Sequence, residues 1–452
     1  MAATLPARRP SRRHGPASHE RTVLPGGLRV ITQSMPAARS VAAGLFVGVG
    51  SRRESEAEAG LSHLLEHLAF KGTAAHPDPG SVSEAVEACG GTLNASTDRE
   101  LTVYSARVPA AATDRALASL ADLVLRPLLR GADLSAEKPV IVDEIRMYVD
   151  SPGDHVFSLF DDLLFPSHPL GREIAGTPRS VRRATRNGVV NHWRRWYRPP
   201  HLVLAVAGAV DHERVLRATA SWFDGQDAWL AGSDQASDQL GGAVAALDET
   251  APQPAPAGRV RVAFRRLSQG NLCLGMPGVS REDPDRWALE LLGAVLGDGM
   301  SSRLFVELRE RRSLAYDVST FSSTYADCGT VGVHAGFEPD RAAQVLAAIL
   351  EQLERVTQEP VRQSELDRAR AYTSGRLVLR MEETGAVAAW LGTGESLLPR
   401  ILSVEEVVER LDAVTIEDLL RVARVHLRPD QARLAMLGPF RSRLPYERAL
   451  RG

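Results

Sequence analysis

Two histidines spaced by one helical turn are the residues in this sequence that most clearly predict chemistry. They lie in the stretch 60–73, which we expect to be helical because its leucines recur at helical spacing. On the face opposite those leucines lie His63, Glu66 and His67. Residues four apart stand one turn above one another, so the two imidazoles can reach a single metal ion. The apolar stripe comprises Leu61, Leu64, Leu65 and Leu68.

The chemistry that suits this pattern is peptide hydrolysis at a zinc ion. Zinc takes neutral imidazole and carboxylate ligands, and a catalytic site keeps one position open for water. Glu66 precedes His67 by one residue, so its carboxylate is placed to take a proton from that water without being a ligand. The order H-x-x-E-H is the inverse of the H-E-x-x-H peptidase motif. By itself the motif leaves open a solvated helix face that happens to carry two histidines.

A third ligand is expected from the stretch 133–149, which is predicted to be helical apart from an interruption at Pro139. Two histidines and a water leave zinc one ligand short, and a carboxylate from a separate helix is the usual completion. Glu137 and Glu144 are seven residues apart, or two turns, and share one face. Glu144 follows the apolar run 140–142, so we expect its helix to be buried and its carboxylate to need a cation. The alternative for Glu144 is an exposed helix glutamate, and spacing alone does not decide between them.

Composition and charge argue against several classes of protein. The chain has 452 residues, too many for one ordinary core, so two or more domains are expected. With a net charge of −2 and no apolar run of about 18 residues, we expect neither a nucleic-acid nor a membrane partner. Three scattered cysteines argue against a disulfide framework and against a thiolate zinc site. The first twenty residues are basic but are not followed by an apolar stretch, so we expect a disordered tail and a cytoplasmic protein.

The second half of the chain repeats the first in outline. A strand at 271–275 and a helix at 284–296 stand where the strand at 41–49 and the metal helix stood, but this second helix has no histidine pair. The intervening stretch is rich in Gly, Ser, Ala and Pro, as linkers are. We therefore predict an α+β fold with two homologous domains, each a mixed or antiparallel sheet covered by helices. The predicted segments are a tail 1–20, a metal-binding domain 21–224, a linker 225–258, a second domain 259–440 and a tail 441–452.

A Gly-rich turn at 297–302 opens a predicted helix in the second half. A phosphate cradle is conceivable there, but the G-K-S/T that completes a phosphate-binding loop is missing. Arg309 and Tyr316, which follow, are donors that could hold a peptide carbonyl and the oxyanion formed when it is attacked. From the residues alone, a surface salt bridge and a core tyrosine are the simpler interpretation. His168 lies between Ser and Pro in a turn, and we expect a structural role for it.

Together these stretches resemble the insulinase-type zinc metallopeptidases, in particular the short-chain branch that includes the mitochondrial processing peptidase β subunit and its bacterial relatives. The resemblance covers roughly 23–439, nearly the whole folded chain. The run from His63-Leu-Leu-Glu-His67 through Leu-Ala-Phe-Lys-Gly-Thr73 resembles the active-site helix of that family. Glu144 lies 77 residues after His67, the kind of spacing at which the family places its third zinc ligand.

The resemblance implies roles for further residues. Glu137 matches the family's glutamate that supports the histidines and catalysis. Arg309 and Tyr316 match its C-terminal Arg/Tyr pair. The stretch 91–104 resembles the edge strand onto which a peptide substrate adds as a further strand. On that strand, Asn94 would lie near the scissile bond, and both Asn94 and Ala95 would bind the substrate.

The resemblance also implies an assembly and an activity. Two chains of such proteins face one another as a clam-shell around a chamber, and the Arg/Tyr pair often reaches the zinc from the facing chain. This chain has both residue sets, which favours a homodimer, with a heterodimer with a related chain as the alternative. The implied activity is a zinc endopeptidase with one Zn²⁺ per chain that cleaves unfolded, precursor or leader peptides. The competing hypothesis is a non-catalytic scaffold or partner subunit of the same fold, which usually lacks the ligands.

Overall fold

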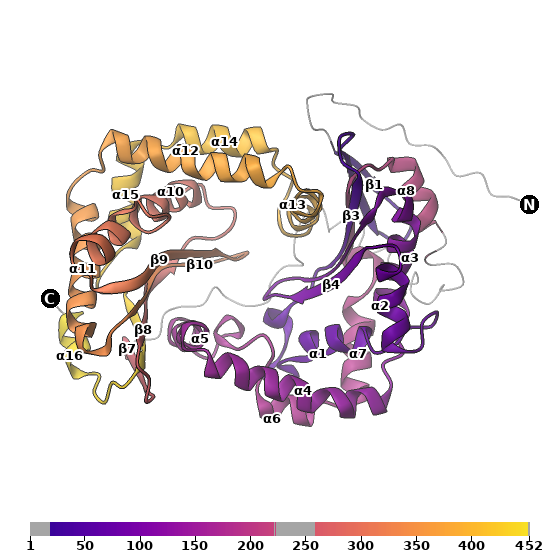
Figure 1. The fold of residues 1–452 in the computed structure, drawn as a ribbon, viewed down its shortest axis with the longest axis horizontal. Coiled ribbons are helices and arrows are strands. Elements are labelled where there is room, and N and C mark those ends of the chain that lie inside the picture. The colour runs from indigo at the N-terminus through magenta and orange to yellow at the C-terminus, as the bar shows by residue number, and fades with distance from the viewer. Residues whose placement is uncertain (1–18, 221, 223–257, 451–452) are drawn as a thin grey trace, which may run out of the picture.

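The computed structural model describes residues 19–220, 222 and 258–450. Within these ranges the chain forms two halves, each built on one mixed sheet, and together they make an open crescent (Figure 1). The expected α+β fold, with two sheets covered by helices, is confirmed. Most of the predicted tail 1–20 and of the predicted linker 225–258 lies outside the described residues.

The first half contains a six-stranded sheet in which β2 and β6 are parallel and the other neighbours are antiparallel. Its central strands β3 and β6 are buried along almost their whole length, which suits their runs of small and branched apolar residues. The strand β4 lies at one edge and pairs with β5. In spatial order the strands are β1 (Glu20–Val23), β2 (Arg29–Ser34), β6 (Leu202–Gly208), β3 (Ser40–Val47), β5 (Thr102–Pro109) and β4 (Thr92–Thr97).

The second half contains a five-stranded sheet that repeats this pattern. Here β7 and β11 are the parallel neighbours, and the remaining neighbours are antiparallel. Strand for strand, β7-β11-β8-β10-β9 corresponds to β2-β6-β3-β5-β4, so the internal repeat expected from the sequence is present in the topology. In spatial order the strands are β7 (Val260–Phe264), β11 (Arg433–Gly438), β8 (Gly270–Gly278), β10 (Gly329–Phe337) and β9 (Ala315–Thr324).

Helices cover both sheets in a matching order. Those of the first half are α1 (Leu61–Ala69), α2 (Pro79–Glu87), α3 (Thr113–Leu125), α4 (Gly131–Asp150), α5 (Pro152–Leu164), α6 (Pro178–Arg183), α7 (Arg186–Trp196) and α8 (His212–Thr219). Those of the second half are α10 (Arg286–Leu296), the π-helix η6 (Phe305–Arg311), α11 (Ala342–Gln358), α12 (Gln363–Arg380), α13 (Thr384–Leu397), α14 (Val404–Ala413), α15 (Ile416–His426) and α16 (Leu444–Ala449).

Two of these helices cross between the halves. The first-half helix α5 packs on β8 and β11 of the second sheet, where Phe160 lies in one apolar cluster with Cys273. The second-half helix α13 packs on β3 and β6 of the first sheet, where Leu391 lies in one cluster with Phe46. Figure 1 shows this exchange at the two ends of the junction. Each sheet is thus completed by a helix from the other half, which fixes the halves relative to one another.

Two expectations about helices were wrong. Pro139 does not interrupt its helix, because α4 runs continuously from Gly131 to Asp150. The proline is exposed, so the carbonyl that loses its backbone partner can reach water, while buried Leu134 and Ile141 hold the helix on either side. The segment 441–452 is not a plain tail either, because it forms α16, and Tyr446 packs in the second core.

None of the helices between residues 19 and 450 that the structure describes combines the length and the apolar character needed to cross a bilayer.

Candidate metal centre

The helix α1 begins at a backbone position that suits only glycine. Gly60, its N-cap, has φ of 93°, and a Cβ there would lie 2.6 Å from the Ala175 carbonyl oxygen. The buried carboxylate of Glu54 accepts hydrogen bonds from the backbone N–H of Gly60 (2.7 Å) and of Ser62 (2.6 Å). A carboxylate at this end of a helix satisfies free N–H groups and the helix dipole. Burial raises the pKa of Glu54 to about 7, and these hydrogen bonds oppose that rise.

The helix α1 buries the face that the sequence predicts and leaves the polar face accessible. The leucines at positions 61, 64, 65 and 68 are buried in the core of the first half, whereas His63, Glu66 and His67 are half-buried on the other face. That face meets α4, which contributes Glu144. The helix α4 is buried on one side only, since Ile141 is inaccessible while Glu144 is half-exposed. The expectation of a buried helix therefore holds for one of its faces.

The three predicted ligands converge. One ligand atom from each of His63, His67 and Glu144 can be chosen so that all three lie within 4.8 Å of one another. The His63 Nε2 atom is 3.6 Å from Glu144 Oε1, and the His67 Nε2 atom is 3.5 Å from Glu144 Oε2. Atoms that each stand about 2.1 Å from a tetrahedral zinc ion are about 3.4 Å apart. The donor types and their separations therefore fit zinc.

Glu137 supports this ligand set from α4. Its Oε1 atom is 2.8 Å from His67 Nδ1, and its Oε2 atom is 2.6 Å from Lys71 Nζ. Burial alone would raise the pKa of Glu137, but the hydrogen bonds with His67 and Lys71 lower it. A carboxylate acceptor at Nδ1 places the ring proton there and leaves the Nε2 lone pair free for a metal.

The two imidazoles have different electrostatic surroundings. Burial, followed by the charge on His67, lowers the pKa of His63 to about 4, so this ring is neutral at pH 7. Burial also acts to lower the pKa of His67, but the hydrogen bond to Glu137 and the charges on Glu144, Glu137 and Glu66 raise it. The negative charge around His67 is the charge that a divalent cation would neutralise.

Glu66 is held by a residue that the sequence did not single out. Its Oε2 atom accepts a hydrogen bond of 2.5 Å from Thr97 Oγ1, at the end of β4. Burial raises the pKa of Glu66, and the bond from Thr97 opposes that rise. No hydrogen bond or ion pair among the described residues ties Glu66 to either imidazole, so its carboxylate is available to a water molecule beside the metal group.

The expected substrate strand lies next to these groups. β4 is the outer strand of its sheet, and it packs against α1. Asn94 is exposed and Ala95 half-buried, in the alternation of a strand with one solvated face. Since β4 pairs with β5 on its other side, one row of its backbone groups is free to bond an added strand.

Arg309 and Tyr316 are not brought to the metal group within this chain. Arg309 lies on η6, exposed, with its guanidinium 4.9 Å from the centre of the Phe305 ring. Tyr316 lies on β9, is 45% exposed, and donates to Gln269 Oε1 at 2.8 Å. Neither residue has a hydrogen bond or ion pair to the three ligands in the part of the chain that the structure describes, and both lie on elements of the other half. The interpretation of Tyr316 as a core residue is wrong, since almost half of its surface is accessible.

Three residues that organise the site were not predicted from the sequence, whereas the structural role predicted for His168 is correct. Thr97, Glu54 and Lys71 all contact the metal helix or its partners. A polar residue at the end of an edge strand and an acid shortly before a helix start are the only local signals for Thr97 and Glu54. His168 has the structural role expected, because its Nδ1 atom accepts from the Leu170 N–H at 3.2 Å.

Comparison with known proteins matches most of the chain to one group of peptidases. Residues 29–178 match the family described as "Insulinase (Peptidase family M16)", and residues 183–372 match the "Peptidase M16 inactive domain". An "uncharacterized zinc protease" of Streptomyces coelicolor is 38% identical over 95% of this chain and 92% of its own length. One from Bacillus subtilis is 30% identical over 92% of this chain and 96% of its own length.

Solved structures show the same fold. A protease from Helicobacter pylori is 23% identical, with a TM-score of 0.82 over 94% of this chain and 100% of its own. A structure described as the peptidase M16 inactive domain from Pseudomonas fluorescens is 20% identical, also with a TM-score of 0.82, over 94% of this chain and 99% of its own. Both similarities concern the arrangement of the two halves.

Proposed function

Because the chain belongs to the insulinase family, peptidase family M16, we propose that it is a zinc-dependent endopeptidase that cleaves unfolded peptides. The observation that carries this proposal is the convergence of His63, His67 and Glu144 beside a carboxylate, Glu66, that a neighbouring edge strand holds in place. This combination supplies a metal position, a proton acceptor and a substrate strand within one region of the first half.

Each residue of the site has a separate role in the proposed reaction. His63, His67 and Glu144 would hold the zinc ion, which when bound acidifies water and polarises a peptide carbonyl. Glu66 would take the proton from the attacking water and deliver it to the leaving amine. The hydrogen bond from Thr97 fixes the Glu66 carboxylate, and burial raises its pKa toward the range in which one group can both accept and release a proton.

The proposed substrates are extended chains. A peptide that adds to the free edge of β4 must offer its backbone hydrogen-bonding groups, and a folded protein rarely can. Asn94 and Ala95 lie on this strand, three and two residues before Thr97. Plausible substrates are leader or targeting peptides, precursor peptides and degraded fragments.

The best test of the reaction is Glu66→Gln. Glutamine keeps the size of the side chain but cannot accept the proton, so turnover of an unstructured peptide should fall about 10²- to 10⁴-fold. The zinc content should stay at one ion per chain, measured by metal analysis. A Glu66→Gln protein that cleaves at the wild-type rate would eliminate this carboxylate as the base. Wild-type cleavage that survives chelation would eliminate zinc.

The proposed assembly is a homodimer in which Arg309 and Tyr316 reach the substrate from the facing chain. The support is their exposure on the half of the chain that does not carry the ligands. Mixing Glu66→Gln with Tyr316→Phe chains tests this directly. If the tyrosine acts across the dimer, random mixing regains about a quarter of wild-type activity from two weak parents. If it acts within its own chain, no mixed site is complete and activity is not regained.

A further inference from the structure

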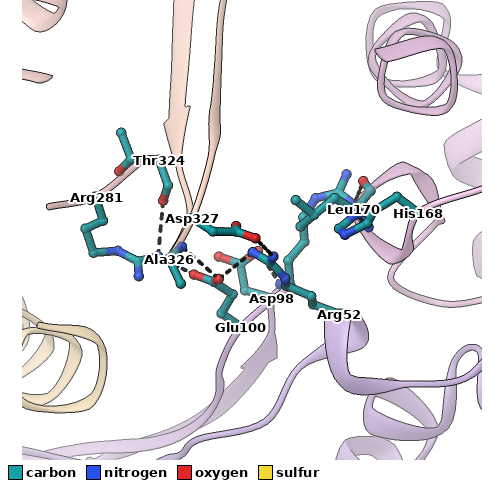
Figure 2. Close-up of polar contacts among 10 residues, drawn as sticks. Arg52, Asp98, Glu100, His168, Leu170, Arg281, Thr324, Ala326 and Asp327 are labelled. Carbon is teal, nitrogen blue, oxygen red and sulfur yellow. Dashed lines mark hydrogen bonds and ion pairs between the residues drawn. The ribbon is translucent and has the colours of Figure 1, made fainter. Parts of the chain in front are cut away.

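A largely buried group of four charged side chains joins the two halves (Figure 2). We call Arg52, Glu100, Arg281 and Asp327 the cross-half ion cluster. The side chain of Arg52 is only 1% exposed, and its Nη1 atom donates to Glu100 Oε1 at 3.0 Å. Its Nη2 atom donates to Asp327 Oδ2 at 2.6 Å. Arg52 therefore bonds one carboxylate from each half.

Glu100 makes the reciprocal connection. It lies in the turn between β4 and β5, and it accepts from Arg281 Nη2 and, at 3.1 Å, from the backbone N–H of Ala326. Arg281 also donates to the Thr324 carbonyl at 3.1 Å, at the end of β9. Figure 2 shows Ala326 and Asp327, from the turn between β9 and β10, on the same side as Arg281, which follows β8. The residues of the first half lie on the other side.

The cluster carries no net charge, and removal of any one of its side chains should be unfavourable. Two guanidinium groups face two carboxylates in a site largely closed to water. A buried ion pair contributes little net stability, but removing one partner leaves a charge without compensation. The ion pairs therefore favour one relative position of the segments that carry the four side chains.

One short link leads from the cluster to Glu66. The turn that carries Glu100 is fixed to the 50–52 segment, since Ser51 N donates to the Asp98 carbonyl at 3.1 Å and Arg52 N to the Arg99 carbonyl at 2.8 Å. A Cβ at Gly50 would lie 2.1 Å from the Asp98 oxygen, so this approach requires glycine. Thr97, which bonds Glu66, is the last residue of β4 and lies three residues before Glu100.

A second link leads to the start of the metal helix. Glu54, two residues after Arg52, bonds the N–H groups of Gly60 and Ser62 at the beginning of α1. The helix that carries both histidines is therefore held by the same segment that bonds the second half. A displacement of Arg52 would reach Glu66 through the turn and the histidines through the helix start.

We propose that the cross-half ion cluster is a positioning device for catalysis, through which the second half of each chain holds Glu66 and β4 of that same chain in their working geometry. This role rests on the proposed peptidase function and is separate from that of Arg309 and Tyr316. It assigns Arg281 and Asp327, in the half without metal ligands, an influence on the reaction rate.

The test is Asp327→Ala in the full-length protein, with Asp285→Ala as the matched control. Asp285 is the same residue type in the same half, its side chain is 24% exposed against 23% for Asp327, and it also bonds an arginine at 2.6 Å. That arginine, Arg421, belongs to the second half and is 49% exposed against 1% for Arg52, so the control removes an aspartate–arginine pair of similar length without touching the junction.

Asp327→Ala should lower kcat at least about tenfold, because small misplacements of a reacting group are costly, with KM changed less than about threefold. Zinc content should stay unchanged. Hydrogen exchange of the amides at 97–101 and 61–64 should become at least about fivefold faster in Asp327→Ala and not in Asp285→Ala. Asp327→Glu, which restores the charge, should recover most of the rate.

A kcat within about twofold of wild type for Asp327→Ala overturns the positioning role, as does a loss of rate that Asp285→Ala reproduces or that follows zinc loss. The exchange measurement separates this inference from the peptidase proposal. If the wild-type protein cleaves no peptide, the proposed function fails, yet faster exchange in Asp327→Ala alone still supports the coupling. Unchanged exchange overturns the coupling whether or not the protein is a peptidase.

Discussion

The helices α1 and α10 occupy corresponding places, each being the first α-helix after a central strand of its sheet, but their free faces differ. In α1 the residues outside the core are His63, Glu66 and His67. In α10 the residues that are not buried are Arg286, Trp287, Glu290 and Gly293. Both helices bury an apolar face of leucines, so the repeated fold constrains that face and leaves the other one to carry chemistry in one half and packing in the other.

The partner helices α4 and α12 also differ between the halves, in the residues that their buried glutamate contacts. On α4 the buried carboxylate of Glu137 meets His67 and Lys71. On α12 the buried carboxylate of Glu365 meets Arg303 through two hydrogen bonds of 2.8 Å. An acid that contacts a candidate metal ligand in the first half thus has an arginine as its partner in the second.

The exchange of α5 and α13 is the feature that the halves share most closely. Each crosses to cover the other sheet, so neither half has a complete core alone. The half without metal ligands is therefore needed for the first sheet to be covered, and through the cross-half ion cluster it also bonds the turn beside Glu66. A half without candidate metal ligands can therefore still bond the segment that follows Thr97.

The largest effect should come from removing a ligand of the first half. His67→Ala deprives zinc of one imidazole and should reduce peptide cleavage by about 10⁴-fold or more, since the acidified water is lost with the ion. Metal analysis should show the zinc missing. On the exposed face of α10, Glu290→Gln should leave cleavage within about twofold of wild type because it is a surface change. Equal losses in the two variants would contradict the asymmetry between the halves.

The next effect concerns the exchanged helices. Phe160→Ala on α5 should reduce the free energy of unfolding by about 3–5 kcal/mol, and Leu391→Ala on α13 by about 2–5 kcal/mol, because each leaves a cavity under a sheet of the other half. Calorimetry should show one transition that moves as a unit in both variants. Two transitions, only one of which shifts, would mean that the halves unfold independently.

A smaller effect should appear at Glu365. Burial acts to raise its pKa, but hydrogen bonds from the Arg303 side chain and the Arg362 backbone lower it to about 2 from the ordinary 4.5. A lowered pKa in the folded state adds stability above the unfolded value, and that stability is lost as the pH falls toward 2. Glu365→Gln should therefore cost up to about 3 kcal/mol at pH 7 and flatten the acid limb below pH 4.5. An acid limb as steep as that of wild type would assign it to other carboxylates.

The smallest effect is expected for the first-half counterpart, Glu137→Gln. Loss of the charged acceptor behind His67 should weaken zinc binding by about 10- to 100-fold without removing the site. Competition with a chelator of known affinity would measure this change. Glu365→Gln is the matched control and should leave the zinc affinity unaltered, so a similar loss in both variants would point to a general loss of stability.

The local part of the site was predictable because it is encoded within a few turns of helix. The leucine stripe of α1 implied the face that carries His63, Glu66 and His67, and the seven-residue spacing placed Glu137 and Glu144 on one side of α4. The rule for proline failed at Pro139, where packing on both sides and exposure of the proline itself outweighed one lost hydrogen bond. Short-range periodicity is a property of the chain itself, so it survives any tertiary arrangement.

What the sequence determined on its own was the set of candidate ligands, the strand and helix order, and the repeat with its single histidine pair. Only the tertiary structure decided that α4 brings Glu144 against α1, that Thr97 holds Glu66, and that Asp327 bonds Arg52 across 275 residues. It also placed Arg309 and Tyr316 away from the ligands of their own chain. These contacts join residues that are far apart in the sequence, and no short-range pattern predicts which of them will meet. They form because the packing of two covered sheets brings distant segments together.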